Sequence, residues 1–294
     1  MITLLHIFSL SDERLILEEI SAPSERASKF QGSWQKWIEE KAPGHTSWVM
    51  HEIDFENDEL LESFSFSRSA WLQLNSQDFI LSTLLTLPLK PVPDERRRKI
   101  GPPPPHGERD HRSFWTPPVY FEGKKTSSAL AVYYTYWPKD ETELSQKKIE
   151  IYFDTKTNFP FPYWIQVSSG HGTLPLQVID SGKGLTSYYS FFPRRNPEFV
   201  KGVERLPNTL RFTLKCPKYY DEFILYAIDT SENKTILPIP FHVQREGQEL
   251  VILDVHKQDL KDLFQKDHAY SWLLMPKENA DHYAEIKEPF LWSY

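Results

Sequence analysis

The sequence predicts an α+β protein: a curved, mainly antiparallel β-sheet or half-barrel packed by N-terminal helices, followed by a small β-rich, sandwich-like unit. Three observations predict this class. Residues 128–192 alternate between apolar and polar side chains almost throughout, which is typical of short antiparallel strands joined by turns. Two early segments carry helix start signals, and five further strand-like runs follow residue 208. The 294 residues suffice for two units, which we place at 1–192 and 193–294.

Two segments near the N-terminus are predicted to be helical. Residues 11–20 open with Ser11 and acidic residues in the first turn, a pattern favoured at helix N-termini. Residues 24–41 carry apolar side chains at helical spacing and are followed by Pro43 and Gly44, which stop helices. The apolar face of this second helix would contain Ala27, Phe30, Trp34, Trp37 and Ile38.

The next part of the chain predicts strands, a short helix and a proline-rich insert. Alternating side chains indicate strands at 46–55 and 60–74, and a short helix then runs through Leu85. Residues 88–118 contain 9 of the 23 prolines, four of them consecutive. Because a four-proline run forms stiff polyproline II and not a helix or central strand, we expect a long surface connection here.

The central meander is the clearest strand pattern of the chain. Its second run places apolar side chains on one face, which we expect to be buried, and polar side chains on the other, which we expect to face solvent. The apolar set is Ile149, Ile151 and Phe153, and the polar set is Lys148, Glu150 and Asp154. The five runs of the meander are 128–137, 147–154, 161–168, 174–180 and 187–192.

The second unit is predicted to be about the size of a small β-sandwich. Residues 193–208 are rich in proline and charge and are typical of a linker. Residues 258–267 predict a short helix, and residues 278–288 a polar helix or loop. The predicted strands are 209–215, 222–229, 235–243, 249–255 and 270–275, of which the third contains two prolines.

Composition excludes several classes of protein. No run approaches about 18 apolar residues, so no membrane span is expected. A net charge of −7 argues against a nucleic-acid binder. The single cysteine, Cys216, allows no internal disulfide and no cysteine-based zinc site, and the neighbouring His106, Asp110 and His111 lack a metal-binding pattern. We therefore expect no cofactor and no metal.

The first residues lack the basic start and the small-residue cleavage site of a secretory signal. The expected location is cytoplasmic by default, and periplasmic or secreted if the natural start lies further upstream.

Three short motifs each allow a functional interpretation beside a structural one. Residues 170–172, Gly-His-Gly, fit a loop with a histidine base, but the glycines favour a hairpin turn. Residues 96–99, Arg-Arg-Arg-Lys, fit phosphate or nucleic-acid binding, but acidic neighbours favour a solvated or salt-bridged loop. Residues 88–91 fit the PxxP pattern bound by aromatic-groove domains, a match that is common by chance.

The excess of aromatic residues is the most unusual feature of the sequence. Both faces of the run 128–137 are apolar or aromatic. One face is expected to pack on the core, and the other to line a cavity or contact a partner. The predicted ligand-binding residues are Tyr133, Trp137, Tyr152 and Trp164. The alternative is a core on both sides of the sheet, covered by the N-terminal helices and the proline-rich insert.

Residues 147–167 read KKIEIYFDTKTNFPFPYWIQV. This stretch resembles the strand, D-x-x-T, turn, proline, strand hairpin of periplasmic lipoprotein carriers of the lipoprotein-localisation type. The resemblance implies an open hydrophobic half-barrel that holds acyl chains. That family has a signal peptide or lipobox and no insert like 88–118, and no functional residue transfers one by one.

We therefore expect a non-enzymatic binding protein with an aromatic apolar cleft, for a ligand such as a lipid or an acyl chain. Its partner would be an apolar small molecule or another protein. The alternatives are a hydrolase that uses histidine and carboxylate residues, and a protein–protein interaction module. A hydrolase needs a nucleophile and a base within hydrogen-bond reach in a cleft, whereas a binding protein shows an apolar concavity with few ionisable groups.

Overall fold

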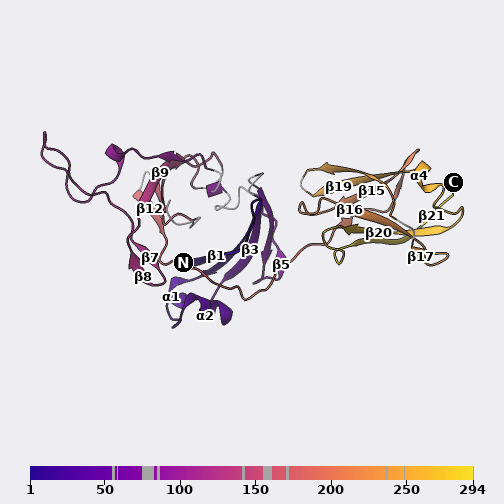
Figure 1. The fold of residues 1–294 in the computed structure, drawn as a ribbon, viewed down its shortest axis with the longest axis horizontal. Coiled ribbons are helices and arrows are strands. Elements are labelled where there is room, and N and C mark those ends of the chain that lie inside the picture. Colours follow the sequence, from indigo (N-terminus) through magenta and orange to yellow (C-terminus); the bar gives the residue numbers. More distant parts are fainter. Residues whose placement is uncertain are drawn as a thin grey trace. The chain divides into compact units, whose positions relative to one another are not determined.

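The computed structural model describes residues 1–54, 57, 59–74, 83–84, 87–140, 143–154, 161–169, 172–235, 238–247 and 249–293. These residues form mostly antiparallel β-sheets in two compact units, Met1–Ser190 and Phe191–Tyr294 (Figure 1). The sheets are open and do not close into barrels. Helices are few and short, so the prediction of an α+β protein with N-terminal helices is wrong, whereas the antiparallel sheet is confirmed. No helix in the described ranges is long and apolar enough to cross a membrane.

The first sheet of unit 1 has the strand order β1-β2-β3-β4-β5, with every neighbouring pair antiparallel. Residues 11–20, predicted as a helix, lie mostly in β2, which pairs with β1 on one side and β3 on the other. Both faces of β2 are buried, and Leu17 and Ile20 are fully inaccessible. Its apolar residues therefore do not alternate with polar ones, and their spacing is compatible with a helix. The bounds are β1 (Ile2–Leu10), β2 (Arg14–Ala22), β3 (Ser47–Asp54), β4 (Glu59–Ser65) and β5 (Ala70–Trp71).

The predicted helix 24–41 is two short pieces, α1 (Ser24–Ala27) and α2 (Trp34–Glu39). Ser33 starts α2 afresh, because its side chain accepts a hydrogen bond from the backbone N–H of Lys36. The helices still bury the predicted apolar face. Trp37 and Ile38 pack on the first sheet in a cluster with Ile20, Ala22, Ala27, Ala42 and Trp48.

The second sheet of unit 1 has the order β12-β11-β10-β9-β6. Its antiparallel pairing of β9 through β12 confirms the meander, although the last predicted run, 187–192, contains no strand. Ile149 and Ile151 are buried as predicted, and Phe153 is half-buried. The bounds are β6 (Lys90–Pro91), β9 (Leu130–Tyr136), β10 (Lys148–Asp154), β11 (Trp164–Ser169) and β12 (Gly172–Gln177).

The face of β10 predicted to be wet is only partly so: Lys148 and Glu150 are part-exposed, whereas the rest of that face is covered. Ile149 and Ile151 belong to one buried cluster, together with Leu87, Trp137, Ile165 and Val167. On the opposite face, Tyr152 packs with Val119, Leu130, Val132 and Tyr163. Asp154, predicted to face solvent, is also buried.

The proline-rich insert 88–118 is a surface connection in which β6 and the 3₁₀ turn η1 (Asp94–Arg96) are the regular elements. A separate hairpin follows it, formed by β7 (Val119–Phe121) and β8 (Lys124–Thr126). Most of the predicted helix ending at Leu85 lies outside the described residues.

Unit 2 consists of two antiparallel sheets. One has the order β13-β15-β19-β18, with β14 also paired to β15, and the other has the order β17-β16-β20-β21. The bounds are β13 (Glu198–Phe199), β14 (Glu204–Arg205), β15 (Thr209–Lys215), β16 (Phe223–Asp229), β17 (Lys234–Thr235), β18 (His242–Glu246), β19 (Leu250–His256), α4 (Lys257–Leu260), β20 (Ala269–Pro276) and β21 (Ala284–Leu291).

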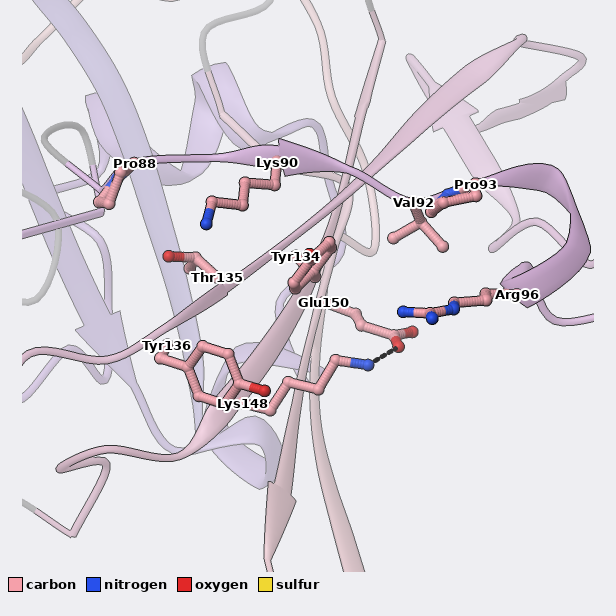
Figure 2. A pocket seen from close by; sticks show the side chains of 10 residues that line it. All are labelled: Pro88, Lys90, Val92, Pro93, Arg96, Tyr134, Thr135, Tyr136, Lys148 and Glu150. Carbon is pink, nitrogen blue, oxygen red and sulfur yellow. Dashed lines mark hydrogen bonds and ion pairs between the residues drawn. The ribbon is translucent and has the colours of Figure 1, made fainter.

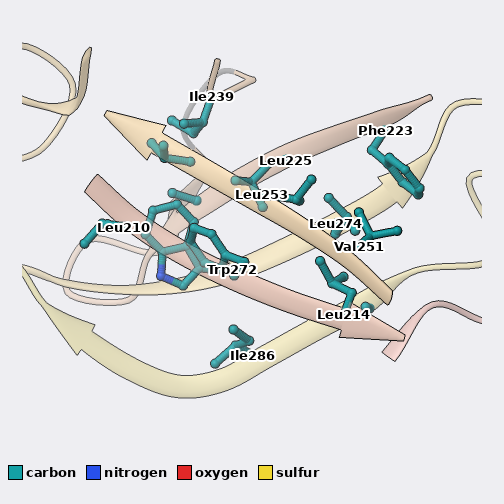
Figure 3. Packing of buried hydrophobic residues seen from close by; sticks show 14 of the residues in the cluster. Leu210, Leu214, Phe223, Leu225, Ile239, Val251, Leu253, Trp272, Leu274 and Ile286 are labelled. Carbon is teal, nitrogen blue, oxygen red and sulfur yellow. The ribbon is translucent and has the colours of Figure 1, made fainter. Parts of the chain in front are cut away.

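The core of unit 2 lies where strands of the two sheets cross, as Figure 3 shows for Leu225, Leu253 and Trp272. Alternate residues of β15, β16 and β19 point inward, which is the expected pattern for a strand with one buried face. Cys216 is buried beside this core, and burial raises the pKa of its thiol to about 12, so it remains a protonated structural thiol.

Two predictions for unit 2 are wrong. Residues 193–208 are not a bare linker, because β13 and β14 both pair with β15. Residues 278–288 run into β21, which pairs with β20, although the sequence pattern there is polar. β21 is an edge strand with only its alternate residues buried, which explains why its sequence carries so little apolar signal.

Candidate functional site

A groove lies where β6 separates from β9. The two strands pair only at Lys90–Tyr134 and Pro91–Tyr133. The same register would place Pro88 opposite Tyr136, and proline has no backbone N–H to donate to a neighbouring strand. Pairing therefore stops after two residues, and the sheet edge beside Tyr136 is left open.

The groove has a volume of about 410 Å³, within the range of about 300–1,000 Å³ that is typical of small-molecule sites. Its walls combine apolar and cationic side chains, which Figure 2 shows from the side of β6. The aromatic rings come from β9, the prolines and two of the cations from the insert, and an ion pair from β10. The lining residues are Pro88, Lys90, Val92, Pro93, Arg96, Tyr134, Thr135, Tyr136, Lys148 and Glu150.

Some of the charged side chains of the groove have an ion-pair partner and others do not. Lys148 Nζ lies 3.0 Å from Glu150 Oε1 and 5.6 Å from the centre of the Tyr134 ring. Lys90 and Arg96, which are both exposed, form no ion pair with a described residue. Among the described residues, the groove therefore carries two positive charges without an ion-pair partner, in a protein whose net charge is −7.

The rest of the basic run is used structurally. Arg97 lies 4.2 Å from the centre of the Phe114 ring, and Arg98 lies 4.3 Å from that of Trp115. Lys99 Nζ contacts Asp110 at 3.0 Å. Arg97 also pairs with Asp94, so two of the four residues 96–99 form salt bridges, Arg98 stacks on an aromatic ring, and Arg96 is exposed, which agrees with the predicted solvated or salt-bridged loop.

The carboxylate of Asp110 is occupied by cationic neighbours within this loop. Arg112 donates three hydrogen bonds to its carboxylate, two from the guanidinium and one from the backbone N–H, and Lys99 donates a fourth, which together hold the pKa of Asp110 well below its usual range. No group of three or more potential metal ligands occurs within the described ranges. Most of the Gly-His-Gly motif lies outside these ranges, and Gly172 begins β12.

The four predicted ligand-binding residues lie on opposite faces of the second sheet. Tyr133 and Trp137 share the face of Ile151, whereas Tyr152 and Trp164 are cross-strand partners on the other face. A single cleft on one face cannot contain all four.

Each of the four is involved in packing. Trp137 is buried and donates a hydrogen bond of 2.6 Å to Asp140, and Tyr133 makes an edge contact with Phe153. Tyr152 and Trp164 both pack edge-on against Trp115, with ring centres 5.5 and 5.3 Å away. Burial raises the pKa of Tyr152. None of the four lines the groove, where the aromatic lining comes from Tyr134 and Tyr136.

A row of polar side chains crosses the first sheet and includes a serine and a histidine. Ser63 Oγ and His51 Nδ1 are 2.8 Å apart, while His51 Nε2 and the nearest oxygen of Glu19 are 3.9 Å apart, beyond a normal hydrogen bond. Ser63 is only 2% exposed. Because a nucleophile must reach its substrate, this arrangement favours a structural role.

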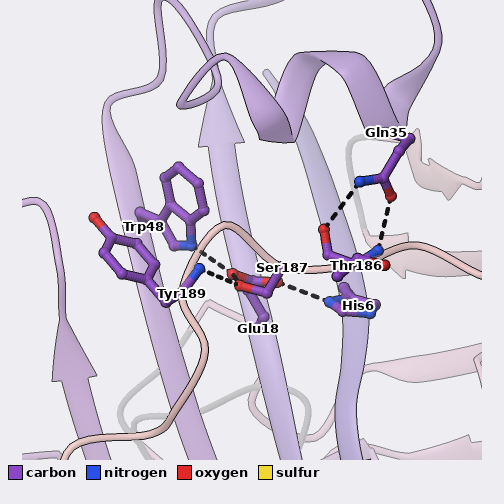
Figure 4. A network of polar contacts seen from close by, with 7 residues as sticks. All are labelled: His6, Glu18, Gln35, Trp48, Thr186, Ser187 and Tyr189. Atoms are coloured by element: carbon purple, nitrogen blue, oxygen red, sulfur yellow. Dashed lines mark hydrogen bonds and ion pairs between the residues drawn. The ribbon is translucent and has the colours of Figure 1, made fainter.

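Glu18 is a fully buried carboxylate of the first sheet (Figure 4). It accepts hydrogen bonds from the Trp48 indole and the Ser187 hydroxyl, and it lies 2.7 Å from His6 Nδ1. Nearby, Gln35 and Thr186 exchange two hydrogen bonds. With these neighbours on both of its oxygens, Glu18 serves to fix the segment around Ser187 on the sheet.

Part of the chain is similar to a protein family and to a solved structure. Residues 3–127 match the family described as CT021 protein, a region that ends before β9 and β10. The structure of the hypothetical protein CT021 from Chlamydia trachomatis is 20% identical, with a TM-score of 0.46, and the similarity covers 65% of this chain and 86% of that one. No curated protein matches the sequence.

Proposed function

We propose that the protein is a non-enzymatic binding protein and that the groove between β6 and β9 binds an elongated apolar ligand such as an acyl chain. The observation that supports this most is the lining itself. The rings of Tyr134 and Tyr136 and the apolar side chains of Pro88, Val92 and Pro93 lie along one open groove. Small-molecule sites combine apolar walls with polar groups that orient the ligand, and this groove supplies both, since half of its ten lining residues are polar or charged.

Two further observations support binding over catalysis. The described lining contains no histidine, serine or cysteine, so it lacks the serine–histidine or cysteine–histidine pair that the hydrolase alternative requires. The closest serine–histidine pair to such an arrangement, Ser63 with His51, is buried on a different sheet. An acyl ligand is also what the resemblance of residues 147–167 to lipoprotein carriers implies.

The proposal is tested by displacement of a fluorescent acyl probe from the full chain with dodecanol below its solubility limit. We expect dodecanol to compete, and we expect Tyr136→Ser to weaken probe binding several-fold because its ring, 61% exposed, is free to contact ligand. Tyr283→Ser is the matched control, because this tyrosine is 48% exposed and lies in unit 2. Failure of dodecanol to compete, or equal binding by the Tyr136→Ser variant and the parent, would refute an acyl site in the groove.

A further inference from the structure

We propose that the ligand carries an anionic head group, a carboxylate or a phosphate monoester, which binds at the end of the groove between Arg96 and Lys148. This inference rests on the proposed function, since it concerns the same groove. Its acyl chain would lie over Tyr134 towards Tyr136 and Pro88.

The charge balance at this end supports an anion. Arg96 and Lys148 point towards Glu150 from different elements, the former from η1 and the latter from β10 (Figure 2). Glu150 pairs with Lys148 at 3.0 Å and not with Arg96. One positive charge at this end is therefore left without a partner among the described residues. The remaining cation of the groove, Lys90, lies on the other side of Tyr134.

Arg96 is held in place by its neighbours. Arg97 and Arg98, which follow it directly, stack on Phe114 and Trp115. The turn that contains Arg96 is closed by hydrogen bonds from its own N–H to Pro93 O and from the N–H of Arg97 to Asp94 O. The backbone at Arg96 is therefore fixed before any ligand arrives, which lowers the entropy cost of binding.

The chemistry of the two cations selects the head group. A guanidinium donates two parallel hydrogen bonds to a carboxylate or a phosphate, and an ammonium adds a point charge. Glu150 opposes such a ligand, because it competes for Lys148 and repels a second anion. Removal of its charge should therefore strengthen binding of an anionic ligand, which a merely structural ion pair does not predict.

The test compares dodecanoate, dodecyl phosphate and dodecanol as competitors of the acyl probe, each below its critical micelle concentration. We expect the anions to bind more tightly than dodecanol. Arg96→Ala should weaken anion binding about tenfold and Glu150→Gln should tighten it several-fold, while dodecanol binding stays constant in both variants. Lys124→Ala, at an exposed position of β8, is the matched control.

The outcomes separate this inference from the function on which it rests. Equal affinity for dodecanoate and dodecanol, or no effect of Arg96→Ala, would overturn the anionic head group while leaving an acyl site. If none of the three competes, the acyl site itself is wrong. A preference for dodecyl phosphate over dodecanoate, lost in Arg96→Ala, identifies the head group as phosphate, and the reverse preference identifies it as carboxylate.

Discussion

The Ser187 hydroxyl donates a 2.6 Å hydrogen bond to the buried carboxylate of Glu18, and this bond joins residues that are 169 positions apart in the sequence. Ser187 belongs to the last segment of unit 1, which ends at Ser190. The same segment places Tyr189 on Phe66, with the two rings stacked at 3.7 Å. This hydrogen bond therefore attaches the last segment of unit 1 to its first sheet.

Loss of this bond should destabilise unit 1. Ser187→Ala removes one donor to a buried carboxylate, which costs about 1–2 kcal/mol, and should lower the melting temperature by a few degrees. Glu18→Gln should cost more, because it removes the charge that Trp48 and Ser187 share at Oε1 and replaces one carboxylate oxygen by an NH2 group that cannot accept, while His6 needs Oε2. Thermal denaturation followed by circular dichroism measures both, with the exposed Ser190→Ala as control. Equal melting temperatures for Ser187→Ala and the control would contradict a stabilising role of this hydrogen bond.

Sequence patterns could predict the strands that have one buried and one exposed face. In β15 and β19 every second residue is buried, and both strands were predicted within two residues of their observed bounds. β2 was missed because it is covered on both faces, so its sequence has no period of two. The helix 24–41 was overestimated because its apolar spacing continues across Gly32, where the chain leaves the helical conformation.

The candidate site was predictable only in its parts. The basic run, the PxxP motif and the aromatic strand each drew attention in the sequence, and the groove takes Arg96, Lys90 and Tyr134 from these three. What sequence could not supply is the register that brings them together, which depends on the two-residue pairing of β6 with β9. The sequence also predicted aromatic residues other than those that line the groove. Tyr133 and Tyr134 point to opposite faces of β9, and the strand pairing is needed to tell which of these faces is open.

Ile151 is an essential core position of the second sheet. Its side chain is fully buried in the cluster around Trp137 and Ile149. Ile151→Asp would bury a charge without a partner, which costs several kcal/mol or more, so we expect unit 1 to unfold. Thr173→Asp on the exposed edge of the same sheet is the control and should fold normally. Circular dichroism and tryptophan fluorescence distinguish the two, and a parent-like melting temperature for Ile151→Asp would show that this face is not core.

The stability of unit 1 should fall as the pH drops from about 6.5 to about 4. Burial lowers the pKa of His51 to about 4 from an ordinary value of 6.5. Between these values the unfolded chain binds a proton that the folded chain does not, so acidification favours unfolding by up to roughly 3 kcal/mol. Burial raises the pKa of the neighbouring Glu19, which acts in the opposite direction and makes the observed loss smaller.

Urea unfolding at pH 7 and at pH 4.5 tests this assignment. The difference in unfolding free energy between the two pH values should shrink in His51→Gln and stay unchanged in His111→Gln, which alters an exposed histidine of the proline-rich insert. Carboxylates that titrate in the same pH range contribute equally to the parent and the variant. Subtracting the two pH dependences therefore leaves the contribution of His51. An unchanged pH dependence in His51→Gln would mean that the imidazole is hydrated in the folded protein.

The two units should unfold as separate cooperative transitions. The core of unit 2 draws all its buried residues from positions 210–292, and the clusters of unit 1 draw theirs from positions before Ser190. Phe212 is fully buried in the unit 2 core, with its ring centre 4.8 Å from that of Trp272. Phe212→Ala should therefore destabilise unit 2 by about 3–5 kcal/mol and leave unit 1 unaffected, because domains with separate cores couple only through their interface.

Calorimetry of the full chain would show this as one transition moving to lower temperature while the other stays in place. Thr213→Ala is the control, since the neighbouring residue of β15 points to the other face and is half-buried. A core cavity loses both the transfer free energy of the ring and its packing contacts, so the expected shift of the unit 2 transition is at least 10 °C for a unit of about 100 residues. If both transitions move together in Phe212→Ala, the two cores are energetically coupled and the chain unfolds as one cooperative unit.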